Sequence, residues 1–232
     1  MMTAGIFAAG EGRRLKKNFP HTIKPMVRIN GKPLLGWMLL LLKKAGFKKV
    51  FILLNSRGKP AKEYLRRKNF GLETKVLTKD TSSSWESFSL LARNLAKHCD
   101  RFLLQTVDSF YPPGEVKKMF SSFPNADMVL GVTSRVCDEK PLWTTINPGK
   151  KIVKMGKNSA DKKRATGGIY ILSSALCENM AGAAEYSALR QYLENMAPIR
   201  NFFAFEISDG VDVDDERDIP LAEAFLKKHG IS

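Results

Sequence analysis

Two glycines and two arginines follow the first apolar segment of the chain. Residues 3–9 are typical of a buried strand, and Gly10, Gly12, Arg13 and Arg14 come directly after it. Glycine lets backbone N–H groups approach phosphate oxygens closely, and a guanidinium can clamp the same anion with two hydrogen bonds. A dinucleotide-binding loop would carry a third glycine where this chain has leucine. The loop therefore indicates phosphate binding and disfavours a nicotinamide cofactor, although taken alone it is equally compatible with a structural turn.

Carboxylates occupy two places where a metal ion could assist phosphate chemistry. Asp108 follows the apolar residues 102–107, which predict a buried strand, and open α/β sheets bind ligands at the carboxyl ends of such strands. Asp212 and Asp214 alternate with valines, so an extended segment would point both toward one cation. Mg²⁺ is usually held by one or two carboxylates together with phosphates and water. We therefore predict Mg²⁺ at Asp108 and Asp214, with Asp212 as the second choice; a loop-capping role is the alternative for Asp108.

The elements that must position these residues alternate between strands and helices. Strands are expected at residues 3–9, 50–54, 74–77, 101–107, 128–133, 143–146, 152–155, 168–172 and 202–207. Helices are expected at 33–45, 60–67, 85–96, 114–123 and from the acidic turn at 212–218 to residue 228. This order predicts a three-layer α/β/α sandwich with a Rossmann-like, mixed but mainly parallel sheet. With no linker or repeat in view, residues 1–232 are expected to form a single domain.

The charge of the chain favours anionic partners. Thirty-eight Lys and Arg against 23 Asp and Glu give a net charge of +15. The lysines are scattered in pairs along the chain, which disfavours nucleic acid and suits small phosphate-bearing substrates. The chain shows neither a signal-peptide pattern nor an apolar run of the ~20 residues that span a bilayer. Widely spaced cysteines without a CxxC pair are expected to be reduced thiols. We expect a cytoplasmic protein without a membrane partner; its oligomeric state is not readable from the sequence.

Three linked motifs resemble the opening of the nucleotidyltransferase family that includes sugar-1-phosphate, phosphocholine and molybdenum-cofactor nucleotidyltransferases. That opening reads approximately AAGxGxRL, then KP, then GKPLL. Here the three motifs are residues 8–15, Lys24-Pro25 and residues 31–35, in the order and at about the spacing of the family. The closing residues 211–219 resemble its DVDTPEDL-type segment, and Asp108 resembles its first metal aspartate. The resemblance spans the whole chain and is strongest over residues 4–54 and 211–226.

The resemblance implies a Mg²⁺-dependent transfer of a nucleoside monophosphate from an NTP to a phosphorylated small acceptor, with release of pyrophosphate, on the nucleotide-diphospho-sugar transferase fold. It assigns catalytic roles to Arg14, Lys24 and Asp108. Arg13 stands where the sugar-specific branch has Thr or Ser, which leaves its role open. Ser82 and Ser83 would contact the base, although their hydroxyls could equally cap a helix. The implied nucleotide-binding residues are Ala8, Ala9, Gly10, Gly12, Arg13, Ser82 and Ser83, and the implied acceptor-binding residues are Lys157 and Gly168.

The acceptor and the base remain open at the level of sequence. The compact length suggests a sugar 1-phosphate or an alcohol phosphate such as phosphocholine, with CTP, UTP, GTP or dTTP as the donor. An NDP-sugar-using glycosyltransferase is an alternative, but it predicts a DxD motif where this chain has Asp108-Ser109-Phe110. A catalytically inactive nucleotide-binding regulatory protein is a second alternative, against which the presence of the basic and acidic site residues argues.

Overall fold

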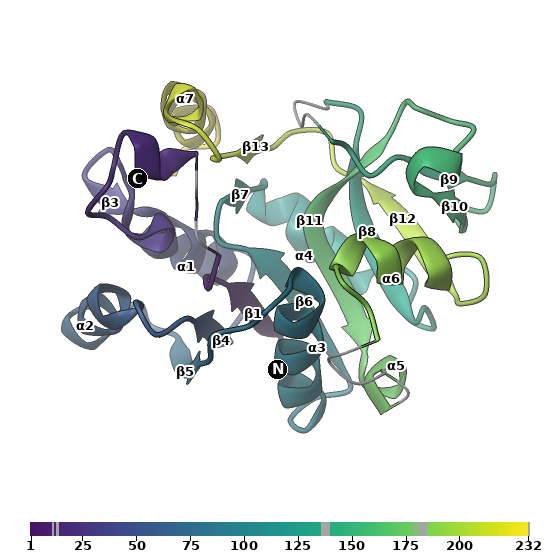
Figure 1. Cartoon of the computed structure of the whole chain (residues 1–232), viewed down its shortest axis with the longest axis horizontal. Coiled ribbons are helices and arrows are strands. Elements are labelled where there is room, and N and C mark those ends of the chain that lie inside the picture. Colours follow the sequence, from purple (N-terminus) through teal and green to yellow (C-terminus); the bar gives the residue numbers. More distant parts are fainter. Residues whose placement is uncertain (11, 13, 136–139, 179, 181–184, 232) are drawn as a thin grey trace. The chain divides into compact units, whose positions relative to one another are not determined.

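The computed structural model describes residues 1–10, 12, 14–135, 140–178, 180 and 185–231 (Figure 1). Its largest sheet has seven strands in the order β12-β8-β11-β6-β1-β4-β5. These strands are β1 (Thr3–Phe7), β4 (Lys49–Leu54), β5 (Glu73–Thr78), β6 (Arg101–Thr106), β8 (Met128–Thr133), β11 (Ala165–Ser173) and β12 (Phe202–Glu206). The pairs β1–β4, β4–β5 and β8–β12 are parallel, and β8–β11 is antiparallel. The predicted mixed, mainly parallel sheet is confirmed.

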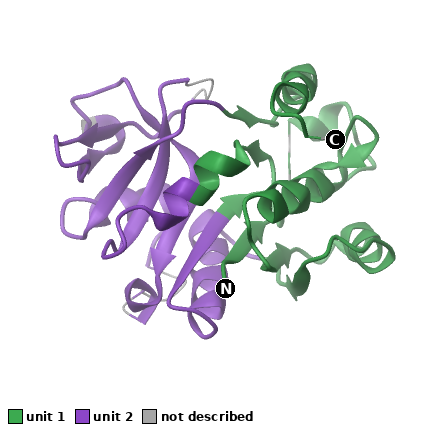
Figure 2. Cartoon of the chain, turned by 180° about the vertical axis from the view of Figure 1, so that it is seen from behind, with its two compact units in different colours: residues 1–80, 105–117, 210–232 green, residues 81–104, 118–209 purple. Residues whose placement is uncertain are grey.

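The chain forms two compact units, and neither is one continuous piece of sequence (Figure 2). Unit 1 comprises residues 1–80, 105–117 and 210–232, and unit 2 comprises residues 81–104 and 118–209. Helix α4 (Pro113–Ser121) begins in the first unit and ends in the second. That the whole chain acts as a single domain stays a prediction. In the part of the chain that the structure describes, no helix combines the length and apolar character that a membrane crossing requires.

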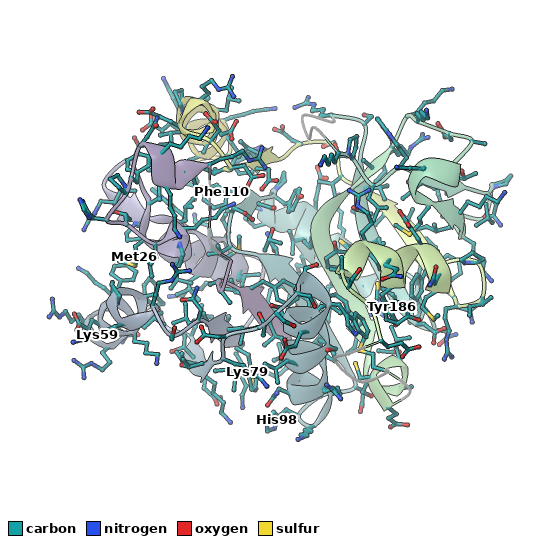
Figure 3. All side chains as sticks on the ribbon, viewed as in Figure 1. Met26, Lys59, Lys79, His98, Phe110 and Tyr186 are labelled. Carbon is teal, nitrogen blue, oxygen red and sulfur yellow. The ribbon has the colours of Figure 1, made fainter. Side chains whose placement is uncertain are left out.

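Unit 1 is built around strands β1, β4 and β5. Its helices are α1 (Leu34–Lys44), α2 (Lys59–Arg67) and α7 (Ile219–Lys228), with 3-10 turns η1 (Leu15–Lys17), η2 (Lys24–Met26) and η4 (Glu216–Asp218). Two small antiparallel pairs join β2 (Arg28–Ile29) to β3 (Lys32–Pro33) and β7 (Ser109–Phe110) to β13 (Val211–Asp212). Phe110, labelled in Figure 3, packs on Phe225 of α7. This contact fixes the last helix beside the strand pair that carries the acidic residues.

Helix α1 confirms the helix predicted from its apolar run. Eight of its eleven residues are buried, because Leu, Met and Trp side chains occur on every face of the helix. It ends at Ala45, and Gly46 then adopts φ +97°, a left-handed conformation that glycine tolerates best. Burial of these large side chains, each contributing about 1.5–3 kcal/mol, holds the segment that follows the phosphate loop.

Unit 2 carries strands β8, β11 and β12. Its other elements are α3 (Ser84–Ala96), β9 (Thr144–Ile146), β10 (Ile152–Met155), η3 (Gly156–Asn158), α5 (Ser174–Glu178) and α6 (Leu189–Met196). An aromatic cluster joins α3 to α6: Trp85 stacks on Tyr192 with ring centroids 4.2 Å apart. Tyr186, which is labelled in Figure 3, contacts both rings edge-on. Buried aromatic rings therefore anchor α6, a helix that the sequence pattern did not predict.

Candidate active site

Lys24 lies between two carboxylates of unit 1. Its Nζ is 2.5 Å from Asp214 Oδ1 and also forms an ion pair with Asp108 Oδ2. The side chain of Lys24 is only 9% exposed, against 15% for Asp108 and 32% for Asp214. Asp108 lies two residues beyond the last residue of β6, at the carboxyl end of the strand as the sequence predicts, and its backbone carbonyl accepts a hydrogen bond from the N–H of Val213. Carboxylates from two distant segments of the chain thus meet at one lysine.

The protonation of this lysine and of Asp108 follows from their mutual charge. Burial alone would lower the pKa of Lys24, but the negative charges of Asp108 and Asp214 raise it above its ordinary value. Burial alone would raise the pKa of Asp108, but the ammonium of Lys24 lowers it below the usual range. Lys24 is therefore a cation and Asp108 an anion at neutral pH.

Arg14 forms an ion pair with the other oxygen of Asp214. The distance from Arg14 Nη2 to Asp214 Oδ2 is 2.7 Å, and the arginine side chain is 48% exposed. Arg14 precedes the 3-10 turn η1, so the glycine loop leads directly into this contact. Asp214 thereby connects the two cationic residues to which the family resemblance assigns catalytic roles.

Asp212 makes a different contact. Strand β13 places it opposite Ser109 of β7, and Ser109 Oγ lies 3.0 Å from Asp212 Oδ1 and 2.6 Å from Thr106 Oγ1. Surrounding protein atoms and the charges of Asp108 and Asp214 raise the pKa of Asp212 above its ordinary value. The side chain nevertheless keeps contact with solvent. Asp212 is thus a reachable carboxylate in surroundings that carry excess negative charge.

Strand β13 ends at Asp212, and the chain bends at Asp214 and Asp215. The backbone N–H groups of Asp214 and Asp215 both donate to Asp218 Oδ2, at 2.9 and 2.8 Å. Asp215 in turn accepts from the N–H of Arg217, which completes a capping box at η4. Asp215 is therefore the N-cap of this turn. Asp214 contacts Lys24 and Arg14, whereas Asp212 contacts Ser109.

The glycine loop is held at its N-terminal end. The N–H of Ala8 donates to the carbonyl of Leu53, and Asn55 Nδ2 donates to the carbonyl of Ala9 at 2.8 Å. Gly12 has φ +58°, and a Cβ built on it would lie 2.8 Å from Lys24 Cβ. Glycine is therefore required here by backbone conformation and by the approach of Lys24. Gly10 has open space around it, and Arg13 lies outside the described residues.

The remaining predicted site residues lie in unit 2. Ser83 Oγ accepts from the N–H of Glu86, and both the N–H and the hydroxyl of Ser82 donate to Glu86 Oε2. These contacts cap α3, so the capping alternative is confirmed, and base contact stays a prediction. Gly168 has φ +72° in β11, where the register with β8 shifts.

Lys157 of η3 lines a cavity in unit 2 with a volume of about 560 Å³. The other residues around this cavity are Lys154, Met155, Arg190, Glu194, Asn195 and Pro198. Three cationic side chains against one carboxylate make the cavity basic. It therefore has the charge expected for binding an anionic small molecule.

Three residues that organise the unit 1 site were not predicted. Ser109 contacts Asp212 through its hydroxyl, Thr106 contacts Ser109 in turn, and Asn55 holds the glycine loop. Ser109 could have been suspected because it directly follows Asp108. Asn55 follows strand β4 at the carboxyl edge of the sheet, which is also a position that favours ligand-binding side chains.

The profile of the MobA-like NTP transferase domain family matches residues 4–197. The chain belongs to this family. The match confirms the nucleotidyltransferase resemblance that the opening motifs indicated. It covers the loop, Lys24 and Asp108, whereas the acidic residues Asp212 and Asp214 lie beyond the matched range.

Two curated relatives match short segments of this chain. N-acetylmuramate alpha-1-phosphate uridylyltransferase of Neisseria meningitidis serogroup B is 47% identical over 51 residues, which are 22% of each chain. D-glycero-alpha-D-manno-heptose 1-phosphate guanylyltransferase of Campylobacter jejuni is 36% identical over 74 residues, which are 32% of this chain and 34% of the relative. The chain thus matches only about a fifth and a third of the lengths of these relatives.

Similarity to a solved structure extends over the whole chain. The inositol-1-phosphate CTP transferase from T. maritima superposes with a TM-score of 0.85 at 21% identity, covering 100% of this chain and 98% of that structure. At this identity the likeness shows the fold. It confirms the fold class predicted from the alternation of strands and helices.

Proposed function

We propose that this protein transfers a nucleoside monophosphate from an NTP to a phosphorylated small acceptor and releases pyrophosphate. Family membership supports this reaction, and the relatives above are named as uridylyl-, guanylyl- and CTP transferases. The observation that carries the proposal is the meeting of Lys24 and Arg14 with the carboxylates of Asp108 and Asp214 beside the glycine loop in unit 1. This arrangement favours nucleotidyl transfer over an NDP-sugar glycosyltransferase or a binding protein without turnover.

The proposed roles follow from charge and position. Backbone N–H groups of the loop and the guanidinium of Arg14 bind the triphosphate. Lys24 is held as a cation by its buried pairing with Asp108, so it can stabilise the negative charge that develops as pyrophosphate leaves. The acceptor phosphate attacks the α-phosphorus in line, and no residue of the chain needs to become a covalent nucleophile. The protein positions the reactants and supplies charge.

The carboxylates of unit 1 fit a divalent cation. Within the described residues, no group of three or more His, Cys, Asp or Glu side chains is arranged as a complete metal site. Mg²⁺ needs only one or two carboxylates, because phosphates and water complete its coordination. Both carboxylate oxygens of Asp214 form ion pairs with cationic side chains, whereas Asp212 contacts the neutral hydroxyl of Ser109. We therefore assign Mg²⁺ to Asp108 and Asp212, in place of the pair favoured by the sequence pattern.

When bound, this cation would neutralise the phosphates of the NTP. Burial first, and then the charges of Asp108 and Asp214, raise the pKa of Asp212, and a bound cation would offset the second of these effects. Ser109 would keep the Asp212 carboxylate in place through its hydroxyl. The hydroxyl of Thr106, 2.6 Å from Ser109 Oγ, would fix that serine in turn.

The proposed acceptor is a sugar 1-phosphate or an alcohol phosphate. The basic cavity of unit 2 supports binding of an anionic acceptor, and its volume lies in the range that small-molecule sites usually have. Lys157 is the side chain proposed to contact the acceptor phosphate. The proposed partners are thus an NTP, Mg²⁺ and this acceptor.

Pyrophosphate release tests the proposal. The protein is incubated with Mg²⁺, each common NTP and a panel of sugar 1-phosphates and alcohol phosphates, with EDTA as a control. The proposal expects release that requires one NTP together with one acceptor and that stops in EDTA. Release without any acceptor would indicate NTP hydrolysis instead. Tight nucleotide binding with no release across the panel would favour a regulatory binding protein.

A further inference from the structure

The carboxylate of Asp214 forms ion pairs with both cationic side chains that the proposed function assigns to the triphosphate. One carboxylate oxygen lies 2.5 Å from Lys24 Nζ, and the other lies 2.7 Å from Arg14 Nη2. A carboxylate that receives charge-assisted hydrogen bonds from both an ammonium and a guanidinium makes the contacts that a phosphate group would make. The site of unit 1 thus contains an internal anion.

The surroundings of this aspartate allow it to be replaced. The side chains of Asp214 and Arg14 are 32% and 48% exposed, so a ligand from solution can reach their contact. Lys24 keeps its pair with Asp108 when Asp214 moves away, so the buried ammonium is not left uncompensated. The backbone of Asp214 is fixed by Asp218, so displacement requires only a rotation of the side chain.

We propose that Asp214 is an internal competitor of the triphosphate, which holds Arg14 and Lys24 in the nucleotide-free protein and releases them when the NTP binds. This inference rests on the proposed function. Asp214 is then a positioning residue: it keeps both cations in place for the phosphates and lowers the affinity for them. Pyrophosphate carries the same kind of charge as the triphosphate, so the same competition favours its departure after transfer.

Binding measured without metal separates this role from metal binding. Isothermal titration calorimetry in EDTA would give the dissociation constants of inorganic pyrophosphate and of the NTP that supports turnover. Asp214→Asn removes the competing charge, so it should bind pyrophosphate about tenfold more tightly than the wild type, which corresponds to about 1.4 kcal/mol. Asp214→Glu restores the charge and should bind within about threefold of the wild type.

Glu73→Gln provides the matched control. It removes one carboxylate from the same unit, but Glu73 lies on the edge strand β5 and pairs with Lys49. Its dissociation constant for pyrophosphate should stay within about twofold of the wild-type value, since distant exposed charges are screened by salt. An equal gain in affinity in this variant would mean that only the net charge had changed, and it would overturn the role of Asp214.

Two further results would overturn the inference. If Asp214→Asn binds pyrophosphate no more tightly than the wild type in EDTA, Asp214 does not compete. If the variant also binds the NTP more weakly only when Mg²⁺ is present, Asp214 is a metal ligand. In both cases the wild-type enzyme would still turn over, so the proposed function would stand. A wild-type protein that neither binds polyphosphate nor turns over would contradict both proposals.

Discussion

Two basic regions of the molecule differ in how their cationic side chains are held. In unit 1, Lys24 and Arg14 form ion pairs with Asp108 and Asp214. In the cavity of unit 2, Lys157 and its neighbour Lys154 are exposed, and neither forms an ion pair with any residue in the described part of the chain. Paired cations are fixed in advance, whereas exposed lysines keep their rotamer freedom.

This difference matches the two kinds of ligand in the proposed reaction. Every NTP presents the same triphosphate, so a rigid site can be built for it, and the internal carboxylates keep its cations in position. Acceptors differ in shape from one relative to another, as the names of the uridylyl- and guanylyltransferases show. Flexible lysines around a cavity suit a phosphate whose attached group varies.

Loss of the positive charge of Lys24 should have the largest effect on the rate of transfer. Lys24→Ala removes the charge that stabilises the departing pyrophosphate, so kcat/KM should fall about 10³-fold for every acceptor. Pyrophosphate release under saturating Mg²⁺ measures this change. Lys32→Ala is the control, because Lys32 lies nearby in sequence but stacks on the ring of Trp37. Its activity should stay within about twofold of the wild type, and a Lys24→Ala variant of similar activity would remove Lys24 from the mechanism.

The second effect concerns the proposed cation. Asp212→Asn replaces a charged ligand by a neutral one, so we expect about a 10²-fold loss of kcat and a higher Mg²⁺ concentration for half-maximal rate. A Mg²⁺ titration of the rate measures both. Asp214→Asn is the comparator and should keep the wild-type Mg²⁺ requirement. The reverse result would return the metal to the pair Asp108 and Asp214 that the sequence pattern favours.

Local patterns were sufficient to predict the loop after β1, helix α1 and the position of Asp108. Each of these depends on residues close together in the chain: glycines after an apolar strand, a continuous apolar run, or an aspartate at a strand end. The mixed sheet followed from the alternation of strands and helices. These features are decided by backbone conformation and hydrophobic periodicity, which the sequence shows directly.

Contacts between distant segments were not predictable in the same way. Lys24 and Asp214 are 190 residues apart, and Ser109 and Asp212 are 103 residues apart. The strands that join Ser109 to Asp212 have two residues each, too few for a periodic pattern. The alternation of Asp212 and Asp214 suggested one shared cation, which stays a prediction; in the structure Asp214 contacts Lys24 and Arg14, whereas Asp212 contacts Ser109.

A substitution in the cavity of unit 2 should reduce activity less than the substitutions in the unit 1 site. Lys157→Ala leaves Lys154 and Arg190 around the cavity, so the KM for the acceptor should rise about tenfold while the KM for the NTP stays unchanged. Steady-state kinetics with each substrate varied in turn would measure the two KM values separately. Lys163→Ala, an exposed lysine of the same unit outside the cavity, should change neither value. An effect on the NTP instead would mean that the cavity does not bind the acceptor.

The smallest expected effect is on stability, and it concerns the packing of the glycine loop against Lys24. Gly12→Ala places a methyl group 2.8 Å from Lys24 Cβ at a backbone φ of +58°, so it should lower the free energy of unfolding by about 1–2 kcal/mol. Gly10→Ala adds the same methyl group where a Cβ meets nothing within 4 Å, so its stability should stay within about 0.5 kcal/mol of the wild type. Urea denaturation followed by circular dichroism compares the two variants. Equal stabilities would mean that the loop and Lys24 move apart freely, and the contrast between a rigid site and a flexible cavity would then lose its structural basis.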